Sequence, residues 1–166
     1  MARKPAAKAA ETPLRILISN DDGYGAPGIR ALERIAKALT SDVWVVAPET
    51  EQSATSHSLT LRRPLRVRKH KPRHFTVDGT PTDCVLVAVQ SITKDRRPDL
   101  VLSGINMGSN LGEDVTYSGT VAAAMEGALL GIKAIAFSQM RDHEGRLDFP
   151  AAEHQATELI RKLPDV

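Results

Sequence analysis

Short apolar runs alternate with helical patterns along this chain, and that alternation constrains the fold more than any other feature. Strands that alternate with helices pair in parallel through crossover helices, and strands covered on both faces are apolar throughout. The sequence therefore predicts one α/β domain with a mostly parallel sheet. The strands are predicted over about residues 15–19, 43–46, 99–103 and 134–137, a hairpin or pair of edge strands over 65–69 and 74–77, and the helices over about 27–39, 82–92, 119–130 and 150–162.

Composition narrows the class of protein. The 166 residues are 42% hydrophobic and 25% charged, which fits one soluble domain, and a net charge of +2 does not indicate a nucleic-acid-binding protein. The single cysteine, Cys84, excludes an internal disulfide framework and is compatible with a reducing compartment. No apolar run approaches the roughly 20 residues of a membrane span. Residues 1–13 are rich in Ala and Lys and are predicted to be a disordered tail, with the cytoplasm as the default location.

Two adjacent aspartates follow the first predicted strand. The strand over 15–19 leads directly into Asn20-Asp21-Asp22-Gly23, and ligands of open α/β sheets bind outside the carboxyl ends of the strands. Two neighbouring carboxylates repel each other, and a hard divalent cation with oxygen ligands relieves that repulsion. The simpler interpretation is a turn, because Asn, Asp and Gly all favour turns.

Three polar loops follow three of the predicted strands, and a parallel sheet brings them to one edge. The loops cover residues 20–25, 49–58 and 104–117. They place four oxygen-bearing side chains where one site can form: Asp21, Asp22, Ser53 and Asn106. Such ligands suit Mg²⁺ or Mn²⁺ rather than Zn²⁺, and no His or Cys cluster indicates a softer metal.

The segment from Tyr117 to Thr120 leads into a predicted helix. The start of a helix offers unpaired amide N–H groups, Gly119 allows close approach of an anion, and Ser118 and Thr120 add hydroxyl donors. A metal next to such a helix start is the arrangement for phosphate-ester chemistry, although an ordinary N-cap explains Ser118 by itself. The phosphate-binding loop of nucleoside triphosphatases and the Gly-x-Gly-x-x-Gly dinucleotide motif are both missing from the sequence.

Several separated motifs, in order, resemble the SurE family of stationary-phase survival proteins. The resemblance covers about residues 14–138. The matching segments are residues 15–23, 26–29, 45–48, 53–60, 79–84, 103–106, 110–112 and 117–127, the last reading Tyr-Ser-Gly-Thr-Val-Ala-Ala-Ala-Met-Glu-Gly.

The resemblance implies a Rossmann-like three-layer sandwich and a metal-dependent 5′- and 3′-nucleotidase that also trims short polyphosphate. It implies one divalent cation per subunit, a nucleoside monophosphate substrate and a homodimer or tetramer. The family's metal ligands fall on Asp21, Asp22, Ser53 and Asn106, the first two also being catalytic. Its phosphate contacts fall on Asn110, Ser118, Gly119 and Thr120. Family members continue well past Val166, so residues 14–166 are interpreted as a domain truncated at its C-terminus, which leaves dimer formation and activity open.

The sequence leaves several alternatives open for the mechanism and the function. The nucleophile is either a water activated by the cation or Asp21 itself. A phosphatase of the haloacid-dehalogenase type also puts an aspartate after its first strand, but its Asp-x-Asp and downstream Lys are not evident. A metal- or nucleotide-binding protein without turnover is the non-enzymatic alternative. His57 fits an ordinary loop role as well as a contact to substrate, and the basic stretch over 62–73 contains few aromatic residues, which argues against single-stranded nucleic acid.

Overall fold

The computed structural model describes residues 12–147 and 149–163. One six-stranded sheet runs through it in the order β3-β4-β2-β1-β5-β6, and neighbouring strands are parallel except for the antiparallel hairpin β3–β4. This confirms the predicted mostly parallel sheet. The strands are β1 (Arg15–Ser19), β2 (Asp42–Pro48), β3 (Val67–Lys71), β4 (His74–Val77), β5 (Leu100–Met107) and β6 (Lys133–Gln139).

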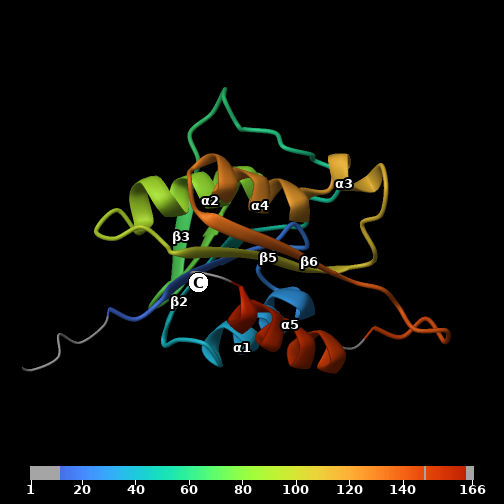
Figure 1. Ribbon diagram of the computed structural model, residues 1–166. Helices are drawn as coiled ribbons and strands as arrows, with labels where there is room; N and C mark the ends of the chain where they lie inside the picture. The colour runs from blue at the N-terminus through green and yellow to red at the C-terminus, as the bar shows by residue number, and fades with distance from the viewer. Residues whose placement is uncertain (1–11, 148, 164–166) are drawn as a thin grey trace, which may run out of the picture.

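Helices cover both faces of the sheet and give the three layers seen in Figure 1. Helices α1 (Pro27–Lys37) and α5 (Pro150–Lys162) pack on one face, and α2 (Pro81–Val87) and α4 (Gly119–Leu129) pack on the other. Helix α2 continues as the π-helical segment η1 (Ala88–Ile92), and the short helix α3 (Asp114–Tyr117) precedes α4. The predicted α/β sandwich is therefore confirmed.

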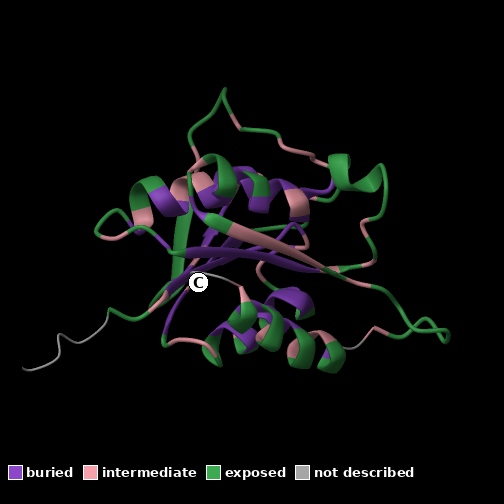
Figure 2. Cartoon of the chain, in the orientation of Figure 1, coloured by how far each residue is buried: buried purple, intermediate pink, exposed green. Residues whose placement is uncertain are grey.

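Successive side chains of the central strands pack alternately into two separate hydrophobic cores, one on each face of the sheet. Ile16 and Ile18 of β1 belong to the cluster beneath α1 and α5, whereas Leu17 belongs to the cluster beneath α2 and α4. All three side chains are completely buried, and the central strands are the most buried part of the molecule in Figure 2. Because strands buried on both faces cannot alternate in polarity, this arrangement explains the near-continuous apolar runs in the sequence.

One boundary differs from the prediction in a way that matters for the site. The predicted loop over 104–117 is wrong at both ends, because β5 continues to Met107 and residues 114–117 form α3. Pairing of β5 with β6 extends to Asn106 opposite Ser138 and Met107 opposite Gln139. Tertiary pairing thus overrides the weak strand propensity of Gly and Asn, and it fixes Asn106 on a strand rather than on a loop.

Two predicted segments extend beyond the described residues. The predicted disordered tail over 1–13 lies outside them apart from Thr12 and Pro13. The predicted domain over 14–166 is described only to residue 163, without residue 148. Within the described ranges, none of the helices is both long enough and apolar enough to cross a membrane.

Candidate active site

A cleft of about 410 Å³ lies at the carboxyl ends of β1, β2 and β5. It contains all four predicted metal ligands and two of the predicted phosphate contacts. The lining residues among these are Asp21, Asp22, Ser53, Asn106, Asn110 and Ser118. The three polar loops therefore meet at one edge of the sheet, as the parallel topology requires.

Asp21 forms the floor of the cleft and is held by the start of α4. Its side chain is buried, with the residue 5% exposed, and its Oδ1 accepts a hydrogen bond from the hydroxyl of Thr120. Gly119 lies so close that an added Cβ would be 2.7 Å from Cβ of Asp21. Burial raises the pKa of the Asp21 carboxyl above its ordinary value, and the hydrogen bond from Thr120 opposes the rise. Gly119 and Thr120 thus lie against Asp21, one layer behind the lining of the cleft.

Asp22 is the least compensated carboxylate of the molecule's described part. Its Oδ2 is buried and has no hydrogen-bond partner. Burial, followed by the negative charges of Asp21 and Glu51, raises the pKa of Asp22 to about 6, while the Met107 backbone lowers it in part. A buried carboxylate oxygen without a donor is costly. The arrangement therefore favours a bound cation at this position.

The remaining two predicted ligands come from different segments. Ser53 lies in the loop after β2, where its hydroxyl donates to Oε1 of Glu51 at 2.7 Å. Asn106 lies near the end of β5 and donates its amide N–H to the carbonyl oxygen of Gly108 at 2.9 Å. That bond assigns the nitrogen of Asn106 to the turn, so its amide oxygen is the atom that a ligand can use.

The predicted phosphate contacts gather around the start of α4. The hydroxyl of Ser118 caps the helix by accepting from the Val121 amide, and it donates to Oδ1 of Asn110 at 3.0 Å. Ser138 of β6 donates to the same Asn110 oxygen at 2.9 Å. Because Oδ1 of Asn110 accepts two hydroxyls, its amide nitrogen is the group available to an anion.

Two charged residues of the cleft were missed by the sequence reasoning. Glu51 adds a third carboxylate, and Arg141, just after β6, adds a cation. Glu51 stands two residues before Ser53 in a polar loop, so the parallel topology was a sufficient signal for it. Arg141 had no comparable signal, because its place depends on the extension of β6 to Gln139.

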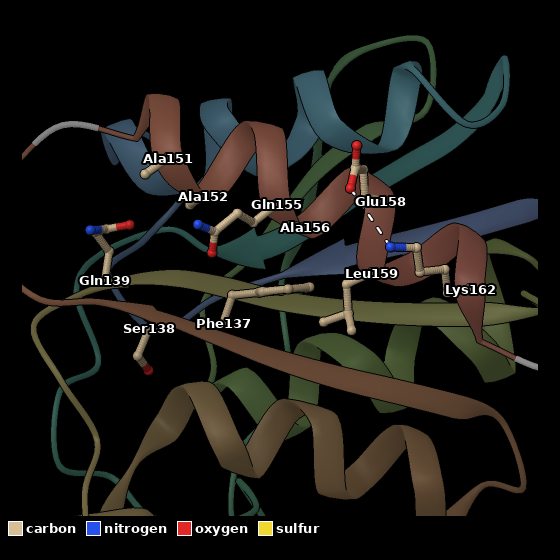
Figure 3. Close-up of a pocket in the computed structure, with 10 residues that line it drawn as sticks. All are labelled: Phe137, Ser138, Gln139, Ala151, Ala152, Gln155, Ala156, Glu158, Leu159 and Lys162. Carbon is tan, nitrogen blue, oxygen red and sulfur yellow. Dashed lines mark ion pairs between the residues drawn. The ribbon is translucent and has the colours of Figure 1, made fainter.

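A larger cavity lies elsewhere and lacks this chemistry. It is a groove of about 520 Å³ between the open edge of β6 and the adjoining face of α5, shown in Figure 3. Apolar side chains such as Phe137 and Leu159 line much of it, and its charged pair is Glu158 with Lys162, 3.8 Å apart. The groove therefore lacks the oxygen ligands and anion-binding groups that make the carboxylate cleft the candidate reaction site.

The chemistry of the cleft fits a hard divalent cation. Two carboxylates, a hydroxyl and an amide oxygen form an all-oxygen set, and such sets suit Mg²⁺ or Mn²⁺. No group of three or more His, Cys, Asp and Glu side chains in the described ranges is arranged to hold a metal ion.

Comparisons with known proteins identify the family. The family model "Survival protein SurE" matches residues 16–165. The 5′-nucleotidase SurE of Paramagnetospirillum magneticum is 65% identical over 155 residues, covering 93% of this chain and 60% of that protein. The 5′-nucleotidase SurE of Parvibaculum lavamentivorans is 57% identical over 159 residues, covering 95% of this chain and 57% of that protein.

A solved structure shows the same fold. The crystal structure of the SurE protein from Aquifex aeolicus superposes with a TM-score of 0.82 at 48% identity, covering 89% of this chain and 59% of that chain. This chain thus spans about 60% of the length of these relatives. On the extent of the family match, together with this agreement in fold, the chain belongs to the SurE family.

Proposed function

We propose that the cleft hydrolyses nucleoside 5′-monophosphates, with one Mg²⁺ or Mn²⁺ ion bound by Asp21, Asp22, Ser53 and Asn106. The observation that carries the proposal is the buried, unpartnered Oδ2 of Asp22 in the same cleft as Ser118, the N-cap of α4. The relatives named 5′-nucleotidase SurE support the substrate class. Nucleoside 3′-monophosphates and short polyphosphate are further substrates to test.

The cation has a defined task in this proposal. When bound, it neutralises charge that develops on the phosphoryl oxygens and lowers the pKa of a water molecule. The carboxylates of Asp21 and Asp22 hold it, and Thr120 keeps Asp21 in place through the hydroxyl hydrogen bond. The family assignment leaves the alternative of a haloacid-dehalogenase-type phosphatase without support.

The chain's own residues bind and orient the phosphate. The amide N–H groups in the first turn of α4 form the anion-binding end of the site, and Ser118 supports it by capping the helix and by donating its hydroxyl to Asn110. Asn110 adds an amide donor, oriented by the hydroxyls of Ser118 and Ser138. Arg141, which lines the same cleft, offsets the repulsion between the four carboxylates of the lining and an anionic substrate.

Two routes to phosphate are compatible with this arrangement. In the first route, Asp21 or Asp22 accepts the proton of an attacking water. Alternatively, Asp21 attacks directly and forms an aspartyl phosphate. The stereochemical course at an isotopically chiral phosphorus distinguishes them. Inversion supports direct attack by water, whereas net retention together with a trapped phosphorylated enzyme supports the covalent route.

The second candidate function is metal and nucleotide binding without turnover, which the same residues of the cleft would serve. The homodimer or tetramer and the cytoplasmic location stay predictions.

Phosphate release tests the proposal directly. Purified protein is assayed with a panel of nucleoside 5′- and 3′-monophosphates in Mn²⁺, Mg²⁺ or EDTA, next to the Asp22→Ala variant. Release that needs the metal and disappears in the variant supports the nucleotidase. Metal binding without release supports the binding alternative, and release that persists in EDTA contradicts the metal-dependent mechanism.

A further inference from the structure

The long loop between β2 and β3 carries Ser53 and has no helix or strand of its own. It covers residues 49–66 and rises above α2 and α4 before it reaches β3 (Figure 1). Such loops are normally the most mobile parts of a fold. A metal ligand must nevertheless be held within a fraction of an ångström of its position. Contacts outside the cleft must therefore fix the loop.

Backbone and hydroxyl contacts tie the loop at several places. The amide of Gln52 donates to the carbonyl oxygen of Asp21 at 2.8 Å, next to the cleft. Ser56 donates its amide to the Tyr117 carbonyl at 3.2 Å and its hydroxyl to the Thr116 carbonyl at 3.0 Å. These bonds hold the loop against the segment that leads into α4.

His57 makes a contact with a carboxylate of α4. Its Nε2 lies 2.9 Å from Oε2 of Glu126. Glu126 is only 8% exposed, and it is the one charged residue among the buried positions of α4. A buried carboxylate on an otherwise apolar helix face needs a donor, and hydrogen bonds to charged groups are about twice as strong as neutral ones. Neither residue touches the cleft.

The two partners join the two halves of the proposed site. His57 follows Ser53 by four residues, and Glu126 belongs to α4, which has Ser118 as its N-cap and Thr120 in its first turn. We propose that the His57–Glu126 pair is a positioning device that fixes the Ser53 loop on α4 and so sets Ser53 opposite the aspartates. The inference rests on the proposed metal site, but its loop-ordering part does not depend on catalytic turnover.

Paired substitutions at His57 separate a donor effect from a packing effect. In His57→Gln the side-chain nitrogen reaches about as far as Nε2, whereas in His57→Asn it is too short to reach Glu126. His57 is partly exposed, with 27% of its side chain accessible, so both variants are expected to fold. His154→Ala, at an exposed position of α5, is the matched histidine control.

Two measurements read the result. Hydrogen exchange of amides 53–58 is recorded in metal-free protein, and Mn²⁺ affinity is measured by calorimetry. We expect His57→Asn to raise the exchange rates and weaken Mn²⁺ binding about tenfold, as loss of an outer-shell partner does, while His57→Gln and His154→Ala stay near wild type. Unchanged exchange in His57→Asn, or equal loss in His57→Gln, overturns the proposal. Faster exchange in a protein that releases no phosphate would refute the nucleotidase and leave the positioning role intact.

Discussion

Asp42 lies at the amino end of the central strands and the Asp21–Asp22 pair lies at the carboxyl end, and the surroundings of these carboxylates differ in charge. At the amino end, Asp42 begins β2 and accepts from Nε of Arg15 at 2.8 Å and from the Trp44 indole at 2.9 Å. Arg73 lies 3.4 Å away and adds a further positive charge. Burial raises the pKa of Asp42, but the hydrogen bonds from Arg15 and Trp44 and the charges of Arg15 and Arg73 outweigh burial and lower it.

At the carboxyl end, Asp21 and Asp22 lack such compensation. Both have a raised pKa, because burial and neighbouring carboxylates disfavour their charged forms. Arg141 lines this cleft, yet its guanidinium donates to the Gly145 carbonyl at 3.1 Å, and no ion pair joins it to either aspartate in the described residues. The comparison indicates that Asp42 has a structural role. The aspartates of the cleft, in contrast, carry negative charge that no cationic side chain neutralises in the described residues, so a bound cation can neutralise it.

The largest expected effect is a loss of activity in the cleft without a loss of stability. Asp22→Ala should reduce metal-dependent phosphate release by about a thousandfold, because the metal loses a carboxylate ligand and several kcal/mol of transition-state stabilisation. Its free energy of unfolding in EDTA should equal or exceed that of wild type, since an uncompensated charge is removed. Urea denaturation followed by circular dichroism measures this free energy of unfolding. A marked loss of stability in Asp22→Ala would show that Asp22 also has a structural role.

A substitution of Asp42, at the amino end of the strands, should have the opposite effect and lower stability without affecting metal binding. Asp42→Asn should lower the free energy of unfolding by about 3 kcal/mol, because Arg15 loses its buried carboxylate and keeps only the exposed Asp95, 3.3 Å away, as an acidic partner. Mn²⁺ affinity should stay within twofold of wild type. Chemical denaturation and calorimetry on the same preparation measure both quantities, and a stable Asp42→Asn variant would remove the distinction drawn between the two ends.

A steric change tests how tightly α4 holds Asp21. Gly119→Ala should cost about 2 kcal/mol of stability, because its Cβ would lie 2.7 Å from that of Asp21 and force the carboxylate or the helix to move. Gly25→Ala is the matched control, since an added Cβ there meets no atom within 4 Å. Similar stabilities for the two variants would contradict the tight packing of α4 on Asp21.

The smallest expected effect is a pH dependence of the metal-free chain. The folded pKa of Asp22 is raised from 3.8 to about 6, so the folded state binds the proton more tightly than the unfolded state does. The resulting stabilisation is complete below about pH 4 and is lost as the pH rises through about 6. The shift corresponds to at most about 3 kcal/mol, and solvent screening of this partly exposed carboxylate reduces the expected loss in wild type, relative to Asp22→Asn, to the order of 1 kcal/mol between pH 4 and 7. Parallel pH profiles of the two proteins would refute the raised pKa.

Sequence reasoning reached the convergence of the three loops but not the contacts that support it. The apolar runs of β1, β2 and β5 were readable because buried parallel strands must be apolar, and they place Asp21, Ser53 and Asn106 at one edge. The cleft position of Arg141 was not readable, because it depends on how far β6 pairs along β5. The contact between His57 and Glu126 joins residues 69 positions apart and has no periodic signal.

Calorimetric titration of the wild-type chain with Mn²⁺ at pH 7.5 tests the central claim most directly, with Asp22→Asn and Asp42→Asn titrated in parallel. We predict one ion per chain, an affinity at least about a hundredfold weaker in Asp22→Asn, and wild-type binding in Asp42→Asn. A wild-type chain that binds no ion, or an Asp22→Asn variant that binds as tightly as wild type, would contradict the assignment of the uncompensated aspartates to a metal site.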